Sequence, residues 1–138
     1  MNNRIRWNDE SWKELNHLVM RLTSEKKLAD ALAAGNELFS LSKRNYGRKH
    51  ANTATALNNL GIIHSLRKEF DDAESYLLAA LQMSERVSGK LSRETAMVNM
   101  NLARLYTIKA NAIYESIGIA ERANSSTTGS QERTIQNA

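Results

Sequence analysis

One phrase occurs twice in this chain: ALNNLG at residues 56–61 returns as VNMNLA at residues 98–103, which is 42 residues later. The same offset places Leu18, Leu60 and Leu102 in register. A register that holds over such a length of chain indicates a tandem repeat. Because one helix pair cannot bury both of its faces, repeats of this kind stack on one another and share a continuous core.

The repeated unit is helical. Leu57, Leu60 and Gly61 follow the spacing of one helix face, and Phe70, Ala73 and Leu77 form a second such stripe. The chain has no proline, the residue that most disrupts helix interiors. We therefore predict an all-α fold. Its six helices should lie at about residues 9–23, 25–45, 52–66, 70–87, 93–109 and 111–123.

Residues typical of helix ends flank these ranges. Gly47 and Gly89 stand where the second and fourth helices should stop, since glycine adopts a positive φ without steric cost. Side chains that accept hydrogen bonds from free first-turn N–H groups are expected before three helices, namely Asn8 or Asp9, Ser24 and Ser92.

The length of 138 residues suits one domain. We divide the chain into an N-terminal segment, a repeat domain of three units and a polar, flexible C-terminal tail. These parts span residues 1–8, 9–123 (units at about 9–50, 51–92 and 93–123) and 124–138. A single continuous helix through residues 93–122 remains an alternative to the last helix pair.

The pattern Leu57-x-x-Leu60-Gly61-x-x-His64, followed by the stripe from Phe70, resembles a tetratricopeptide repeat. The segment from Gly47 to Gly61 is similar to the 42-residue subtype found in kinesin light chains. The resemblance implies a right-handed α-solenoid of about three helix-turn-helix units. The chain departs from the family pattern at Ala51, where a proline is usual, and at three turn positions where glycine is usual, namely Lys26, Lys68 and Ala110.

The resemblance also implies that the first helix of each pair lines a concave groove. Residues on that side of each first helix are the candidates for binding a partner. They are Asn16, His17, Thr55, Asn58, Asn59, Ile62, Met97, Asn101 and Arg104, with Lys13, Met20 and Met100 nearby.

Asn59 and Asn101 are the strongest of these candidates, because the resemblance implies that the matching asparagines contact bound peptide. A carboxamide offers two donor hydrogens and an acceptor oxygen, which suits a peptide backbone. The alternative is that both side chains bond neighbouring helices or their own loop. For Arg104 the two hypotheses are a bond to a peptide carboxylate and a solvated surface position.

Other function classes find less support. The basic run KRNYGRKH at residues 43–50 could contact nucleic acid, but the net charge is only +4 and the equivalent loop of the next unit is not strongly basic. We find no phosphate loop, HExxH or GxSxG motif, and so we expect no enzyme and no cofactor. The cluster at Asp71, Asp72 and Glu74 suits a first helical turn, and with no opposing ligand visible we expect no metal.

The sequence therefore predicts a cytoplasmic module that binds a peptide or helix of a partner protein in its groove. The absence of cysteine and of a long apolar segment agrees with that location and with no membrane partner. The alternative is a self-assembling dimer formed through an apolar edge at Ile113, Ile117 and Ile119. A nucleic-acid-associated regulator ranks third.

Overall fold

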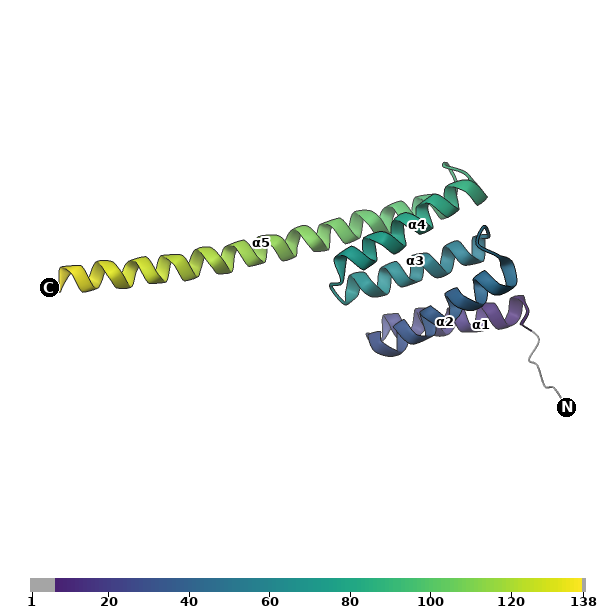
Figure 1. Cartoon of the computed structure of the whole chain (residues 1–138), viewed down its shortest axis with the longest axis horizontal. Coiled ribbons are helices and arrows are strands. Elements are labelled where there is room, and N and C mark those ends of the chain that lie inside the picture. The colour runs from purple at the N-terminus through teal and green to yellow at the C-terminus, as the bar shows by residue number, and fades with distance from the viewer. Residues whose placement is uncertain (1–6, 138) are drawn as a thin grey trace. The chain divides into compact units, whose positions relative to one another are not determined.

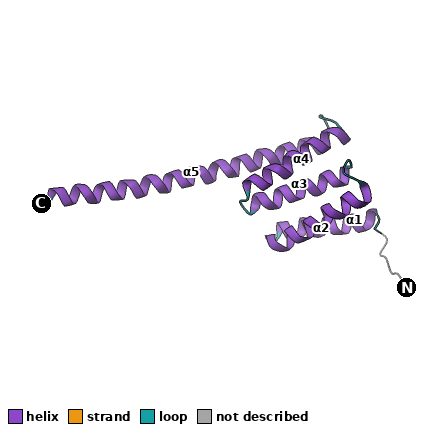
Figure 2. Ribbon diagram, viewed as in Figure 1, coloured by secondary structure: helices purple, strands orange, loops and turns teal. Residues whose placement is uncertain are grey.

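The computed structural model describes residues 7–137, and within this range it contains five α-helices and no strand (Figure 1, Figure 2). The helices are α1 (Asp9–Ser24), α2 (Leu28–Tyr46), α3 (Ala51–Leu66), α4 (Phe70–Ser88) and α5 (Arg93–Gln136). The protein is an all-α solenoid. Its residue contacts divide it into a compact unit that ends at Leu105 and a second unit that begins at Tyr106, and each is described by itself.

The offset of 42 residues reappears in the helix boundaries. Helices α1 and α3 each have 16 residues and begin at Asp9 and Ala51, while α2 and α4 each have 19 residues and begin at Leu28 and Phe70. Helix α5 begins at Arg93, which is 42 residues after the start of α3. The first unit therefore consists of two equivalent helical hairpins and the beginning of a third.

The connections between hairpins are equivalent too. Gly47 and Gly89 end α2 and α4 with φ values of +88° and +97°, as the sequence predicts. The buried Thr53 and Thr95 each donate a hydroxyl hydrogen bond to the carbonyl of the preceding glycine, at 2.7 and 2.8 Å. This bond holds the first turn of each following helix against the loop.

Two apolar clusters form the core of the first unit, and α3 contributes to both. One cluster joins α1, α2 and α3, and the other joins α3, α4 and the start of α5. The first contains Trp12, Val19, Ala31, Leu38, Ala56 and Ile63; the second contains Leu57, Ala73, Leu77, Ala80, Val98, Leu102 and Leu105. Helix α3 is buried because it has a hairpin neighbour on each side, which is how a repeat array builds its core.

The first hairpin is closed by tryptophans. Trp12 is buried and its indole Nε1 donates to the hydroxyl of Ser42 at 2.9 Å. Trp7 packs against the same cluster. Both tryptophan rings therefore belong to the core of the first hairpin.

Two helix ends differ from the prediction. Asn8 caps α1 and Ser92 accepts from the N–H of Thr95, both as expected. The predicted cap at Ser24 is wrong, because this residue is the last of α1 and its hydroxyl donates to the carbonyl of Arg21. Helix α2 instead begins after Lys27, which provides no side-chain cap.

The largest difference concerns α5. The sequence predicts a turn near Ala110 and a flexible tail from Asn124, with one continuous helix through residues 93–122 as the alternative. The structure has one helix from Arg93 to Gln136, in agreement with the alternative. Ala110 carries no signal that stops a helix, and no proline follows. Within residues 124–129, side-chain hydroxyls bond carbonyls one turn earlier, as Thr127 does to Ala123 at 3.0 Å. In the part of the chain that the structure describes, no helix has the length and apolar character needed to cross a bilayer.

Candidate functional site

A groove of about 250 Å³ opens on the first unit. Its walls come from the first helices of the successive hairpins, α1, α3 and the beginning of α5, together with the C-terminal end of α4. Six of its lining residues were singled out from the sequence, namely Asn16, Met20, Thr55, Asn58, Asn59 and Met97. The other six are Ala51, Ala54, Ser84, Ser88, Glu94 and Val98.

Asparagine carboxamides pair between consecutive first helices. Asn59 Nδ2 on α3 donates to Asn16 Oδ1 on α1 at 2.7 Å, and Asn101 Nδ2 on α5 donates to Asn58 Oδ1 on α3 at 2.9 Å. The partners are 43 residues apart in both cases. The pairs thus follow the repeat, and each links one hairpin to the next.

This pairing shows the structural use of asparagine, which the sequence left open as an alternative. The pairing leaves binding capacity unused. Each carboxamide has two donor hydrogens and one acceptor oxygen, and each of these bonds engages one group on either partner. Asn16 Nδ2 also donates to Met20 Sδ at 3.7 Å. Asn16 and Asn59 are half-buried at the groove wall, where their remaining groups can reach a ligand.

The remaining predicted residues lie elsewhere. Asn101 does not line the groove, and its Nδ2 donates to Asn58 Oδ1. His17 and Arg104 are exposed and Ile62 is half-buried, and none of the three lines the groove. Met97 and Met100 are both exposed, but only Met97 lines the groove.

Sequence reasoning missed the contribution of α4. It considered only first helices, whereas Ser84 and Ser88 reach the groove from the end of a second helix. The repeat offset offers a signal for one of them, because Ser84 is equivalent to Ser42, and both are buried small polar residues near a hairpin junction.

The groove is mainly apolar, with one charge. Its floor includes Met20, Met97 and Val98, and Glu94 is the single charged residue among those that line it within the described chain. Glu94 lies in the first turn of α5, where the positive end of the helix favours a carboxylate. A ligand with an apolar side chain beside a basic group would complement this surface.

The basic run at residues 43–50 spans the last turn of α2 and the loop after it, and its own neighbours partly engage it. The ammonium group of Lys43 lies over the ring of Phe39 at 4.3 Å, and the ring of Tyr46 stacks on His50 with centroids 4.6 Å apart. Tyr46 donates to Asp9 Oδ1 at 2.6 Å. Burial, and then the adjacent carboxylate, raise the pKa of Tyr46 above its ordinary value.

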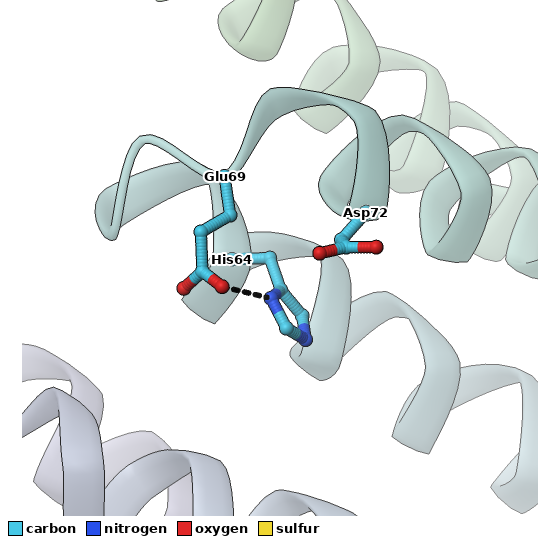
Figure 3. Close-up of side chains that lie close together, drawn as sticks. All are labelled: His64, Glu69 and Asp72. Atoms are coloured by element: carbon cyan, nitrogen blue, oxygen red, sulfur yellow. Dashed lines mark ion pairs between the residues drawn. The ribbon is translucent and has the colours of Figure 1, made fainter.

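A second group of functional side chains lies at the turn between α3 and α4. His64 is buried and stacks on Tyr76, with ring centroids 5.1 Å apart. Glu69 and Asp72 lie close to it (Figure 3). Sequence analysis considered Asp72 only together with Asp71 and Glu74. It did not join Asp72 to His64 and Glu69, because the turn rather than one helix face brings these three together.

The comparisons with known proteins agree with this geometry. A profile described as "Tetratricopeptide repeat" matches residues 15–86, a little more than half of the chain. The chain belongs to the tetratricopeptide repeat family. Repeats of this family generally mediate contacts between proteins. The matched segment covers most of the two complete hairpins and ends before α5.

Two known proteins are similar to this tetratricopeptide repeat chain, one in sequence and one in structure. It is 33% identical over 79 residues to the Clustered mitochondria protein homolog of Meyerozyma guilliermondii, a match that covers 57% of this chain and 6% of that protein. The crystal structure of BtubC (BKLC) from P. vanneervenii superposes with a TM-score of 0.66 at 25% identity. That match covers 75% of this chain and 42% of the other, so the chain spans less than half the length of either relative.

Proposed function

We propose that this tetratricopeptide repeat unit binds an extended peptide segment of a partner protein in the groove between α1, α3 and α5. The observation that carries the proposal is the meeting of half-paired carboxamides and an apolar floor in one open groove. Carboxamides at the wall can bond the backbone of an extended chain, whatever its sequence. We also propose that this chain belongs to the kinesin light chain-like subtype of the family.

The floor indicates which peptides should fit. Methionine side chains adapt their shape and contact apolar groups without strict geometry, so Met20 and Met97 would accept several apolar anchors. Glu94 favours a Lys or Arg next to that anchor through a charge-assisted hydrogen bond. We therefore expect ligands with an apolar residue adjacent to a basic one.

The test is a selection of random displayed peptides on the 138-residue chain, followed by affinity measurements with the best peptide. Met97→Glu should weaken binding at least about tenfold, because it places a charge in the apolar floor. Met100→Glu is the matched control: both methionines are exposed, at 54% and 64%, but only Met97 lines the groove.

Asn59→Ala separates binding from stability. Loss of the bond to Asn16 should lower the free energy of unfolding by about 1 kcal/mol, the contribution of a typical hydrogen bond. If the carboxamide also bonds the ligand, the free energy of peptide binding should fall by more than that. Equal peptide binding by the wild type, Met97→Glu and Asn59→Ala would reject the groove as the binding site.

Self-assembly is the second candidate, and one observation favours it. Taken by itself, the second unit exposes several large apolar residues on α5, namely Ile113, Tyr114, Ile117 and Ile119. Such a surface could pair with its copy in a second chain. Sedimentation or light scattering over a wide concentration range would detect the dimer, and Ile117→Lys should abolish it; a strict monomer at high concentration would dismiss this candidate.

A further inference from the structure

Three potential metal ligands meet at the turn between α3 and α4 (Figure 3). His64 lies in the last turn of α3, Glu69 immediately precedes α4, and Asp72 lies in its first turn. One ligand atom of each residue lies within 4.8 Å of the others. His64 Nδ1 is 3.6 Å from Glu69 Oε2, which is beyond hydrogen-bond distance.

Helix capping does not account for all three side chains. The positive end of a helix favours carboxylates in the first turn, which is sufficient reason for Asp72. Glu69 occupies the capping position but makes no side-chain capping bond, and its carboxylate is directed to Arg67 and His64 instead.

Helix capping does not explain the position of the His64 imidazole. His64 is only 8% exposed, and its Nδ1 atom has no hydrogen-bond partner. A buried polar atom left without a partner costs about 1–3 kcal/mol. Such an atom calls for an explanation, and an ion that bridges Nδ1 and the carboxylate of Glu69 would provide one. The stacking on Tyr76 holds the ring in this orientation, with Nδ1 facing the carboxylate of Glu69.

We propose that His64, Glu69 and Asp72 bind one divalent transition-metal ion, with Zn²⁺ as the representative. One imidazole nitrogen and two carboxylate oxygens are a ligand set that such ions accept, and water can complete the coordination. Two ligand atoms about 2.1 Å from a tetrahedral Zn²⁺ lie roughly 3.4 Å apart. The separation of 3.6 Å between His64 Nδ1 and Glu69 Oε2 is close to that value. Asp72 is exposed, and one of its carboxylate oxygens lies within 4.8 Å of both other ligand atoms.

Arg67 prepares Glu69 for this role. Its guanidinium bonds Oε1 of Glu69, while Oε2 faces His64. A carboxylate held through one oxygen presents the other in a fixed direction, which is how groups outside a metal's ligand set orient its ligands.

The site belongs to the second hairpin alone. At the equivalent positions of the first hairpin, 42 residues earlier, the chain has Leu22, Lys27 and Asp30. Only the aspartate could bind a metal there. An ion at the second hairpin would join the end of α3 to the start of α4 and so stabilise that turn. This role is independent of the peptide groove.

Calorimetric titration of the metal-free 138-residue chain with ZnCl₂ at pH 7 tests the proposal. We expect one ion per chain and a rise of the melting temperature with Zn²⁺, since binding to the folded state stabilises it. His64→Leu, which introduces the residue of the first hairpin, should lower the affinity at least about tenfold. Asp72→Asn should do the same.

Asp30→Asn is the matched control, because it makes the same change at the equivalent position of the first hairpin, and it should bind Zn²⁺ as the wild type does. If His64→Leu fails to fold, the comparison of Asp72→Asn with Asp30→Asn still decides, because both side chains are exposed. The proposal is overturned if the wild type takes up no ion, or if Asp72→Asn binds as tightly as Asp30→Asn.

Discussion

Two lysines occupy a backbone conformation that normally selects glycine. Lys26 and Lys68 have φ values of +60° and +61° at the turn inside each hairpin. In both turns the N–H of the residue after the lysine donates to the carbonyl five residues earlier, as Glu69 N–H does to the carbonyl of His64 at 3.0 Å. This arrangement ends the first helix of the pair, and it requires a left-handed residue just after the helix. The sequence departs from the family at these positions, and the structure keeps the turn nevertheless.

Lys68→Gly should therefore stabilise the protein. Left-handed backbone costs a residue with a Cβ about 1–2 kcal/mol, and the greater freedom of glycine in the unfolded chain offsets part of the gain. We expect the free energy of unfolding to rise by about 0.5–1 kcal/mol, measured by urea denaturation. Lys68→Ala retains the Cβ and should show no such gain, and a loss of stability in the glycine variant would disprove the expectation.

Gly61 is required for a different reason, which is close packing. A Cβ at this position would lie 2.5 Å from Leu77 Cγ and 3.3 Å from the backbone nitrogen of Leu77. Gly61→Ala should lower the free energy of unfolding by about 1–3 kcal/mol, because either α3 or α4 must shift. In a Leu77→Ala background the penalty should shrink, since the clashing atoms are gone. Additive losses in this double-mutant cycle would show that the contact does not limit the packing.

The candidate site could be predicted only in part at this scale. The groove-lining places of Asn16, Thr55, Asn58, Asn59 and Met97 follow from the helix periodicity and the family resemblance. The 43-residue pairing of carboxamides does not, because it depends on the distance between neighbouring helices. Their role in binding a partner stays a prediction.

At the scale of elements, the sequence predicted the four helices of the two hairpins to within three residues at each end. It was accurate because the apolar stripes are strong and the glycines at positions 47 and 89 mark the ends. It failed for α5, where the family pattern favours a third hairpin over the alternative of one continuous helix. A turn needs a residue that stops the helix, and the sequence around Ala110 offers none.

The two parts of α5 should differ in local stability. Val98, Leu102 and Leu105 are buried in the core, whereas most side chains from residue 106 to 129 are exposed. Helices without tertiary packing open readily, so amide hydrogens of residues 106–129 should exchange far faster than those of residues 98–105. Hydrogen exchange followed by mass spectrometry measures this. Equal protection along α5 would mean that its second part packs against another surface, as the dimer would require.

At the scale of the whole molecule, the repeat explains both the stability and the groove. Each hairpin leaves an apolar face that the next one covers, and the first helices come to lie beside one another along the array. The Asn16–Asn59 and Asn58–Asn101 bonds join those helices at the same level. The groove is therefore a consequence of stacking, and no single hairpin could form it.

The most direct test of the groove follows the asparagine side-chain amide signals of a ¹⁵N-labelled chain by NMR while a selected peptide is added. We predict that the signals of Asn16, Asn58 and Asn59 shift with peptide concentration, because these carboxamides line the groove. The signals of Asn36 and Asn45, exposed on α2, should stay in place. Saturable binding that leaves the first three signals unchanged would contradict the central claim that the stacked first helices form a peptide-binding surface.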